Sequence, residues 1–158
     1  MKNYFTLAYI RNLEDKEKFL FLLRNKKKND INKGKYIGIG GHVEEGESPD
    51  QGIDREIFEE TGLIVKNKIH CGSVFYRDIS GYHETMEVYY VDDYKGLLHE
   101  CDEGELHWLY PQEFMDLPHW KADEIFLDYV FQGKVFSKMS FLYDKDNLLE
   151  VVKEWIIQ

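Results

Sequence analysis

Residues 38–63 read GIGGHVEEGESPDQGIDREIFEETGL, and this stretch decides the fold. Ser48 is a favourable N-cap, a proline follows at the first helical position, and Gln51 completes a Ser-x-x-Gln capping box. Gly62 stands where a left-handed C-cap residue is expected. These signals predict a helix over Pro49–Thr61, with both ends set by local chemistry.

The same stretch concentrates acidic residues along that helix. Eight acids lie between Glu44 and Glu60, against one base, Arg55. At about 100° per residue, Glu56, Glu59 and Glu60 fall within an arc of about 100°. Like charges at such spacings cost roughly 0.2–0.5 kcal/mol per pair, so the arrangement favours a bound cation such as Mg²⁺ or Mn²⁺, which prefers hard oxygen ligands. The glycine-rich turn before the helix would let backbone groups approach a ligand, whereas the alternative is a solvated acidic face.

The composition is that of one folded domain. The chain has 158 residues, of which 43% are hydrophobic and 15% aromatic, so disorder is not expected. Its apolar runs are too short to span a bilayer, and its start has no signal-peptide pattern. The net charge of -10 argues against binding to long nucleic acid or to an anionic membrane. We expect a cytoplasmic protein in which Cys71 and Cys101 are free thiols.

Strand and helix signals alternate through the rest of the chain. No repeat, low-complexity tract or long linker divides it, so we expect a single domain over residues 1–158. The mixture predicts the α/β (α+β) class, with helices covering a mixed sheet. The last segment, Leu148–Ile157, is predicted as strand or helix. A second, amphipathic helix is predicted over Trp120–Phe131, and strands over Tyr4–Arg11, Lys18–Arg24, Leu63–Lys66, Ile69–Arg77, Thr85–Val91, Leu106–Tyr110 and Val135–Tyr143.

Residues 41–63 resemble the Nudix box, G-x5-E-x7-R-E-U-x-E-E-x-G-U, in which U is an aliphatic residue. The resemblance implies the Nudix fold, a mixed β-sheet sandwiched between helices, with the box as a loop–helix–loop. It also implies a hydrolase that cuts the phosphate chain of a nucleotide. The chain matches the box at every defined position, namely Gly41, Glu47, Arg55, Glu56, Ile57, Glu59, Glu60, Gly62 and Leu63.

The resemblance further implies a divalent metal site, with Mg²⁺ as the cofactor and Mn²⁺ as a substitute. Metal ions in such a site polarise the phosphate, neutralise charge on the leaving group and lower the pKa of a bound water. Glu47 and Arg55 would pair to orient the loop against the helix. Glu56 is the candidate general base, with a loop carboxylate as the alternative. The implied metal ligands are Glu56, Glu59, Glu60, the carbonyl of Gly40 and, in the acidic loop after the box, Glu103.

Nearly the whole chain is similar to the MutT-type group that hydrolyses oxidised nucleotides such as 8-oxo-dGTP. The similarity extends through residues 25–41, 100–108 and 136–143. It implies cleavage of a nucleoside triphosphate to a nucleoside monophosphate and pyrophosphate. It also implies a base pocket in which a tryptophan stacks on the base and an acid reads the purine edge. The residues expected to bind substrate are Arg24, Ile37, Tyr76, Met86, Trp120 and Asp123.

Two positions depart from the animal enzymes of that group. Ile37 stands where those enzymes carry an asparagine and Ala122 where they carry an acid, and both positions contact the oxidised purine there. These departures put the animal mode of base recognition in doubt. Core packing is the alternative role for Trp120 and Met86, and an exposed helix acid is the alternative for Asp123.

Other Nudix activities remain as alternatives. ADP-ribose hydrolases tend to carry a proline in the stretch after the box, and none follows here until Pro111. Dinucleoside polyphosphate hydrolases favour a tyrosine nearby, and Tyr76 and Tyr82 are not well aligned with it. A non-catalytic Nudix ligand-binding module would typically have an eroded box, and this box is intact. We therefore expect a small-molecule nucleotide as the partner of a monomer or homodimer.

Overall fold

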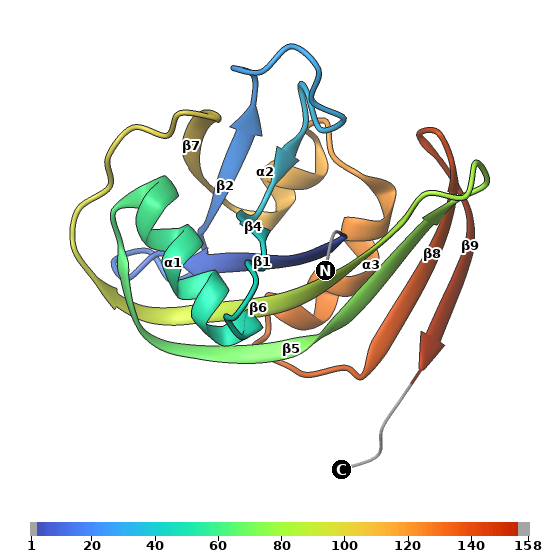
Figure 1. The fold of residues 1–158 in the computed structure, drawn as a ribbon. Helices are drawn as coiled ribbons and strands as arrows, with labels where there is room; N and C mark the ends of the chain where they lie inside the picture. Colours follow the sequence, from blue (N-terminus) through green and yellow to red (C-terminus); the bar gives the residue numbers. More distant parts are fainter. Residues whose placement is uncertain (1–2, 155–158) are drawn as a thin grey trace.

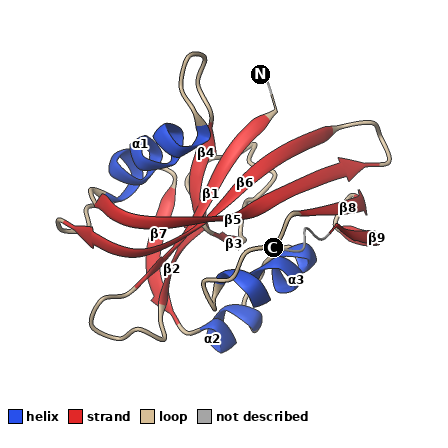
Figure 2. Ribbon diagram, turned by 90° about the horizontal axis from the view of Figure 1, so that it is seen from below, coloured by secondary structure: helices blue, strands red, loops and turns tan. Residues whose placement is uncertain are grey.

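The computed structural model describes residues 3–154, which form a mixed sheet covered by helices on both faces (Figure 1). The helices are α1 (Pro49–Thr61), α2 (Pro111–Met115) and α3 (Lys121–Val130), and the strands are β1 (Tyr4–Arg11), β2 (Phe19–Arg24), β3 (Tyr36–Ile37), β4 (Ile39–His42), β5 (Ile64–Asp78), β6 (His83–Lys95), β7 (Gly104–Leu109), β8 (Lys138–Asp144) and β9 (Asn147–Glu154). Figure 2 shows α1 on one face of the sheet and α2 with α3 on the other. The predicted class and architecture are confirmed. In the described range, no helix is long and apolar enough to cross a membrane.

Strand β1 lies inside the sheet and is paired along both edges. The strand order is β3-β2-β1-β6-β5-β8-β9, with β1–β6 and β5–β8 parallel. The other edge of β1 is shared, because β4 pairs with its first half and β2 with its last residues. A Cβ on Gly40 would lie 1.9 Å from the Thr6 carbonyl oxygen, so only glycine fits in β4 at this point. The box loop therefore leaves from the middle of the sheet.

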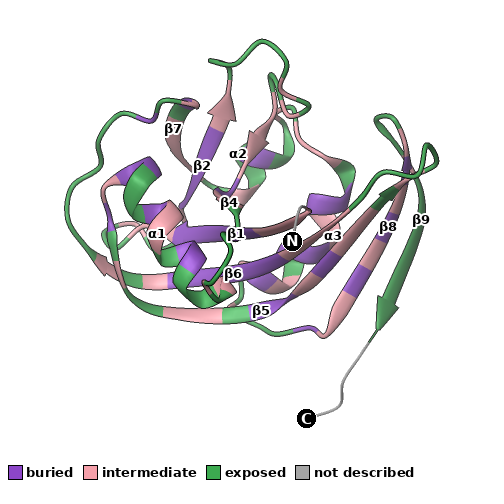
Figure 3. Ribbon diagram, in the orientation of Figure 1, coloured by how far each residue is buried: buried purple, intermediate pink, exposed green. Residues whose placement is uncertain are grey.

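Two apolar cores form because the sheet is covered on both sides. Along β6, Val88 and Tyr90 belong to the core under α3, whereas Tyr89 and Val91 belong to the core under α1. This alternation is the period of two expected of a strand. Figure 3 shows the buried residues concentrated in the central strands, with β9 largely exposed at the edge.

Helix α1 begins and ends where its capping chemistry predicts. Ser48 N donates to Gln51 Oε1 at 2.9 Å, and Gln51 N donates to Ser48 Oγ at 3.2 Å. Gly62 has a φ of 82°, and its N–H donates back to the last turn of the helix. Ile53 and Ile57, one turn apart, are fully buried against the sheet. The helix is thus held at both ends and along one face.

Several elements differ from the sequence predictions, among them the short strands β3 and β4, which the predictions lack. The two strands predicted over residues 63–66 and 69–77 are one strand, β5, in which register shifts around Asn67 interrupt the side-chain alternation. α2 is absent from the predictions because five residues are too few to show a helical period, although its Phe114 is fully buried. The final segment is a strand as far as Glu154, and residues 155–157 of that prediction lie outside the described residues.

A polar cluster joins β1, β5 and β6 beside the start of α1. The Glu87 carboxylate, 6% exposed, accepts hydrogen bonds from Tyr4 Oη (2.8 Å) and Ser73 Oγ (2.5 Å), and lies 2.9 Å from His70 Nε2. His70 also stacks on Tyr89, whose hydroxyl donates to the first turn of α1. The hydrogen bond to Glu87 raises the pKa of His70. Burial alone would raise the pKa of Glu87, but the hydrogen bonds from its three partners outweigh burial and hold that pKa below its usual value.

The pairing of His70 with Glu87 should make folding stability depend on pH. The raised His70 pKa contributes stability below the ordinary value of 6.5, which is lost as the pH rises through the folded-state pKa. The lowered Glu87 pKa contributes stability above the ordinary value of 4.5, which is lost as the pH falls through the folded-state pKa. We therefore expect His70→Gln to lower the free energy of unfolding most at about pH 5.5 and least at about pH 8.

Urea unfolding of the wild type and the variant at these two pH values measures the difference. His83→Gln is a suitable control, because His83 lies on the neighbouring strand and its ring contacts Phe75 rather than an acid. An equal destabilisation by His70→Gln at both pH values would contradict the ion pair.

Candidate active site

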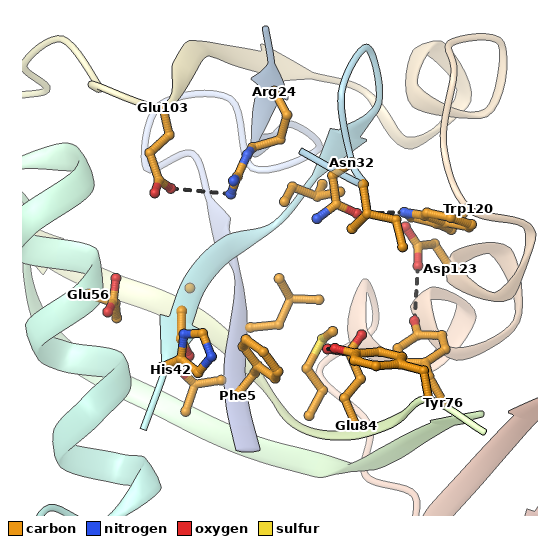
Figure 4. A pocket seen from close by; sticks show the side chains of 18 of the residues that line it. Phe5, Arg24, Asn32, His42, Glu56, Tyr76, Glu84, Glu103, Trp120 and Asp123 are labelled. Carbon is orange, nitrogen blue, oxygen red and sulfur yellow. Dashed lines mark hydrogen bonds and ion pairs between the residues drawn. The ribbon is translucent and has the colours of Figure 1, made fainter. Parts of the chain in front are cut away.

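A cavity of about 570 Å³ connects α1 with the aromatic residues near α3 (Figure 4). Acidic and basic side chains line one end, and mostly aromatic and apolar side chains line the other. Of the predicted site residues, Glu47, Arg55 and Glu59 do not line it. The others do, with Arg24, Gly40, Glu56, Glu60 and Glu103 at the first end and Ile37, Tyr76, Met86, Trp120 and Asp123 at the second.

Glu47 and Arg55 are in direct contact and tie the box loop to α1. Arg55 Nη2 lies 2.7 Å from Glu47 Oε1, and Arg55 Nε lies 3.1 Å from Glu47 Oε2. This bidentate geometry is the strongest form of a guanidinium–carboxylate contact. The hydrogen bond from Arg55 lowers the pKa of Glu47 to about 2. Arg55 also donates to the His42 carbonyl at 3.1 Å, so one side chain fixes both ends of the loop.

Arg55 also holds two of the predicted metal ligands. Its Nη1 lies 2.9 Å from Glu56 Oε1 and 3.2 Å from Glu59 Oε2. The Glu59 side chain is 55% exposed. Across residues 3–154, no group of three His, Cys, Asp or Glu side chains is arranged to hold a metal ion. The guanidinium contacts carboxylate oxygens that a metal ion would use, so the predicted ligand set is brought near the cavity but is not assembled as a metal centre.

Glu60 is a buried acid whose hydrogen-bonding capacity is not satisfied. It is 8% exposed, and among residues 3–154 its Oε2 finds no hydrogen-bond partner. Burial, followed by the neighbouring Glu103 carboxylate, raises the pKa of Glu60 to about 9. Glu103 itself pairs with Lys27 at 2.9 Å and Arg24 at 3.2 Å. A buried acid with a bare oxygen is costly, and a bound cation would offset that cost.

This end of the cavity fits a divalent cation. The available donors are oxygens, which are the ligands that Mg²⁺ and Mn²⁺ prefer, and one of them is the bare oxygen of Glu60. A Cβ on Gly41 would lie 2.7 Å from the Glu56 carboxylate, so glycine leaves that carboxylate free of the loop. The predicted metal ligands that line the cavity are the carboxylates of Glu56, Glu60 and Glu103 and the carbonyl of Gly40.

The opposite end is an aromatic pocket with one fully buried acid. Asp123 is 3% exposed, and burial raises its pKa to about 8, so its carboxyl is largely protonated at neutral pH. A protonated carboxyl both donates and accepts hydrogen bonds. Tyr76 Oη lies 3.4 Å from Asp123 Oδ1, and Trp120 packs edge-on against Tyr143 at 5.4 Å between ring centroids. The alternative of an exposed helix acid is therefore wrong for Asp123.

Several cavity residues are absent from the sequence predictions. Asn32 accepts a hydrogen bond from Trp120 Nε1 at 2.7 Å, across 88 positions of sequence. Glu84 lines the wall near Tyr76, and burial raises its pKa. His42 packs against Phe5 between the acidic end and the pocket. These residues lie in a polar loop and at strand ends, where the sequence offers no periodic signal that marks them.

The comparisons with known proteins agree with one another. The NUDIX domain model matches residues 5–130. The chain is 32% identical over 117 residues to the oxidized purine nucleoside triphosphate hydrolase of Danio rerio, covering 73% of this chain and 74% of that protein. It is 28% identical over 130 residues to the Mus musculus protein of the same name, covering 81% and 83%.

A solved structure with a similar fold is the MutT protein from Bacillus halodurans. The TM-score is 0.80 at 24% sequence identity, covering 95% of this chain and 96% of that one. The similarity therefore extends beyond the residues that the domain model matches, to the β8–β9 hairpin.

The unsatisfied Glu60 should give opposite effects on stability with and without metal. Glu60→Gln removes a buried acid, so we expect the metal-free variant to melt several degrees above wild type, since about 1 kcal/mol shifts Tm of a domain by about 2–8 °C. The same change removes a carboxylate ligand of the metal ion, so the rise in Tm that Mg²⁺ gives the wild type should be lost. Thermal unfolding with EDTA and with MgCl₂ measures both effects.

Glu45→Gln is the matched control, because Glu45 lies in the box loop and is exposed. It should leave both Tm values unchanged. A Glu60→Gln variant that retains the full Mg²⁺-induced rise in Tm would rule out Glu60 as a ligand.

Proposed function

The chain belongs to the Nudix hydrolase family, and we propose that it hydrolyses a purine nucleoside triphosphate, 8-oxo-dGTP or a related oxidised nucleotide, to the monophosphate and pyrophosphate with Mg²⁺. The observation that carries this proposal is the single cavity that joins the box carboxylates to an aromatic pocket with a buried acid. A triphosphate and a base linked by one sugar would need these two environments in one cavity. The mouse and zebrafish relatives, named as oxidized purine nucleoside triphosphate hydrolases, support the same substrate class.

In the proposed reaction, a water molecule attacks a phosphorus of the triphosphate chain, and the products are a nucleoside monophosphate and pyrophosphate. Glu56 accepts the proton of that water, because its carboxylate lies in the cavity and Arg55 holds it in place. Glu47 keeps Arg55, and therefore the loop, in a fixed position. Arg24 lies at the same end of the cavity, where its positive charge would attract the phosphate chain.

Mg²⁺ would be held by the carboxylates of Glu56, Glu59, Glu60 and Glu103 with the carbonyl of Gly40. The ion supplies Lewis-acid polarisation of the phosphate and neutralises charge on the leaving group. Lys27 pairs with Glu103 at the same end of the cavity, so its positive charge lies where the phosphate chain would bind.

The base would occupy the aromatic pocket. Trp120 offers a stacking surface, and stacking of a base on an aromatic side chain contributes about 1–3 kcal/mol. The largely protonated Asp123 would both donate to and accept from the purine edge. Ile37 and Met86 line the cavity as apolar wall, so Ile37 contributes shape where an asparagine would contribute a hydrogen bond.

A substrate panel tests the proposed activity. We expect kcat/KM with Mg²⁺ to be highest for 8-oxo-dGTP among 8-oxo-dGTP, the four normal dNTPs, ADP-ribose and Ap4A, with monophosphate and pyrophosphate as products. EDTA should abolish turnover, and Glu56→Gln should lower kcat by roughly 10²–10⁴-fold, the usual contribution of a general base. A higher kcat/KM for ADP-ribose or Ap4A would instead assign the site to nucleoside diphosphate derivatives.

The stacking role of Trp120 can be separated from a role in packing. Trp120→Leu should raise KM for the preferred nucleotide by about tenfold or more, because the lost stacking energy is about 1–3 kcal/mol. The matched control is Trp108→Leu, since Trp108 packs against the core under α1 and does not line the cavity. Thermal unfolding should show a loss of stability in the control, and its kinetics should show an unchanged KM. An unchanged KM in Trp120→Leu would remove this residue from the pocket.

A further inference from the structure

The surroundings of Trp120 determine which of its surfaces a ligand can reach. Lys35 Nζ lies 4.3 Å from the ring centroid, and Lys35 is not among the cavity-lining residues. Lys35 therefore lies over one face of the indole from outside the cavity, and Trp120 itself lines the cavity. The indole edge is also occupied, because its Nε1 donates to Asn32 Oδ1 at 2.7 Å. A base stacked on the indole from the cavity would have Asn32 beside its edge.

Asn32 is held in place by the loop that carries it. Its backbone N–H donates to Asp30 Oδ1 at 2.9 Å, and its carbonyl accepts from the Lys35 N–H at 2.9 Å. The Asp30 carboxylate in turn accepts from Arg24 Nε at 2.6 Å, and its side chain is 6% exposed. The loop therefore fixes the position of the Asn32 side chain before a ligand binds, which reduces the entropic cost of binding.

The hydrogen bond to Trp120 also fixes the orientation of the Asn32 amide. An indole N–H is only a donor, so the amide oxygen must face it and the amide nitrogen must lie on the other side. Figure 4 shows that nitrogen turned away from Trp120, toward the interior of the cavity. Among residues 3–154, no side chain or carbonyl accepts a hydrogen bond from it. A fixed donor without a partner in a binding cavity is suited to a ligand acceptor.

We propose that Asn32 is a specificity-determining residue, which donates a hydrogen bond from its side-chain amide to a carbonyl oxygen on the edge of a purine stacked on Trp120. This inference rests on the proposed function. The residue selects bases that present an oxygen over bases that present an amino group at that edge, since an amino group would meet the Asn32 donor with a donor. A site with a fixed donor discriminates strongly in this way, because a mismatch leaves both groups without a partner.

Two pairs of nucleotides test the inference. dITP and dATP differ at C6, where one has an oxygen and the other an amino group, and 8-oxo-dGTP and dGTP differ by the oxygen at C8. The variant is Asn32→Asp, which keeps an oxygen for Trp120 Nε1 and replaces the donor by an acceptor. We expect it to lower the kcat/KM ratio of oxygen-bearing to matched nucleotide by about tenfold or more in one pair, the equivalent of one lost hydrogen bond. The pair that changes identifies the edge that Asn32 reads.

Two further variants keep the test decisive. Asn32→Ser removes the amide without adding charge and should lower the same ratio, even if Asn32→Asp disturbs the loop. Asn12→Asp is the matched control, because Asn12 does not line the cavity and uses only its side-chain oxygen, which accepts from the backbone of Glu14 and Asp15. It should leave both ratios unchanged.

The outcomes separate this inference from the proposed function. If the wild-type protein hydrolyses none of the four nucleotides with Mg²⁺, the proposed function itself is wrong. If it hydrolyses them and both Asn32 variants leave the two ratios within about threefold of wild type, the inference is overturned. A fall in kcat/KM that is equal for all four nucleotides also overturns it, because Asn32 would then only position Trp120.

Discussion

The guanidinium of Arg55 is the interaction on which the acidic end of the cavity depends. Like charges gathered on α1 and the preceding loop would otherwise repel one another and separate the two segments. A planar guanidinium with five N–H donors contacts several carboxylates at once in fixed directions, which a lysine ammonium does not do. Because Arg55 lies one residue before Glu56, the contact positions the loop and the acidic face of the helix together. Its partners are Glu44, Glu47, Glu56, Glu59 and the carbonyl of His42.

A buried acid lowers the folding stability at each end of the cavity, for a different reason in each case. Glu60 is buried beside another carboxylate, so both burial and like charge raise its pKa. Burial raises the pKa of Asp123, and the hydrogen bond from Tyr76 opposes this shift. A folded protein gains nothing from two such acids unless ligands meet them, and strongly perturbed carboxyls in one cavity are a mark of a functional site. The first environment suits a cation and the second suits a neutral, hydrogen-bonding ring.

The part of the structure that local chemistry controls could be predicted from the sequence. The limits of α1 follow from Ser48, Gln51 and Gly62, and the box carboxylates follow from their spacing on that helix. The continuity of β5 could not be predicted, because its bulges disturb the alternation that marks a strand. Nor could the pairing of Lys27 with Glu103, which joins two loops 76 positions apart. Such contacts depend on how the sheet brings loops together, and no local pattern encodes that.

The polar loop of residues 25–35 reaches both ends of the cavity. Lys27 pairs with Glu103 at the acidic end, and Asn32 holds Trp120 at the aromatic end, with Asp30 fastened to Arg24 between them. The carboxylates on α1 are positioned by a helix packed into the core, whereas Asn32 at the aromatic end is carried by a surface loop, and such loops tolerate change. If the base binds at the aromatic end as proposed, a substitution in this loop would alter which base is accepted and leave the box geometry intact. We therefore propose that this loop, rather than the box, sets the substrate preference of the chain.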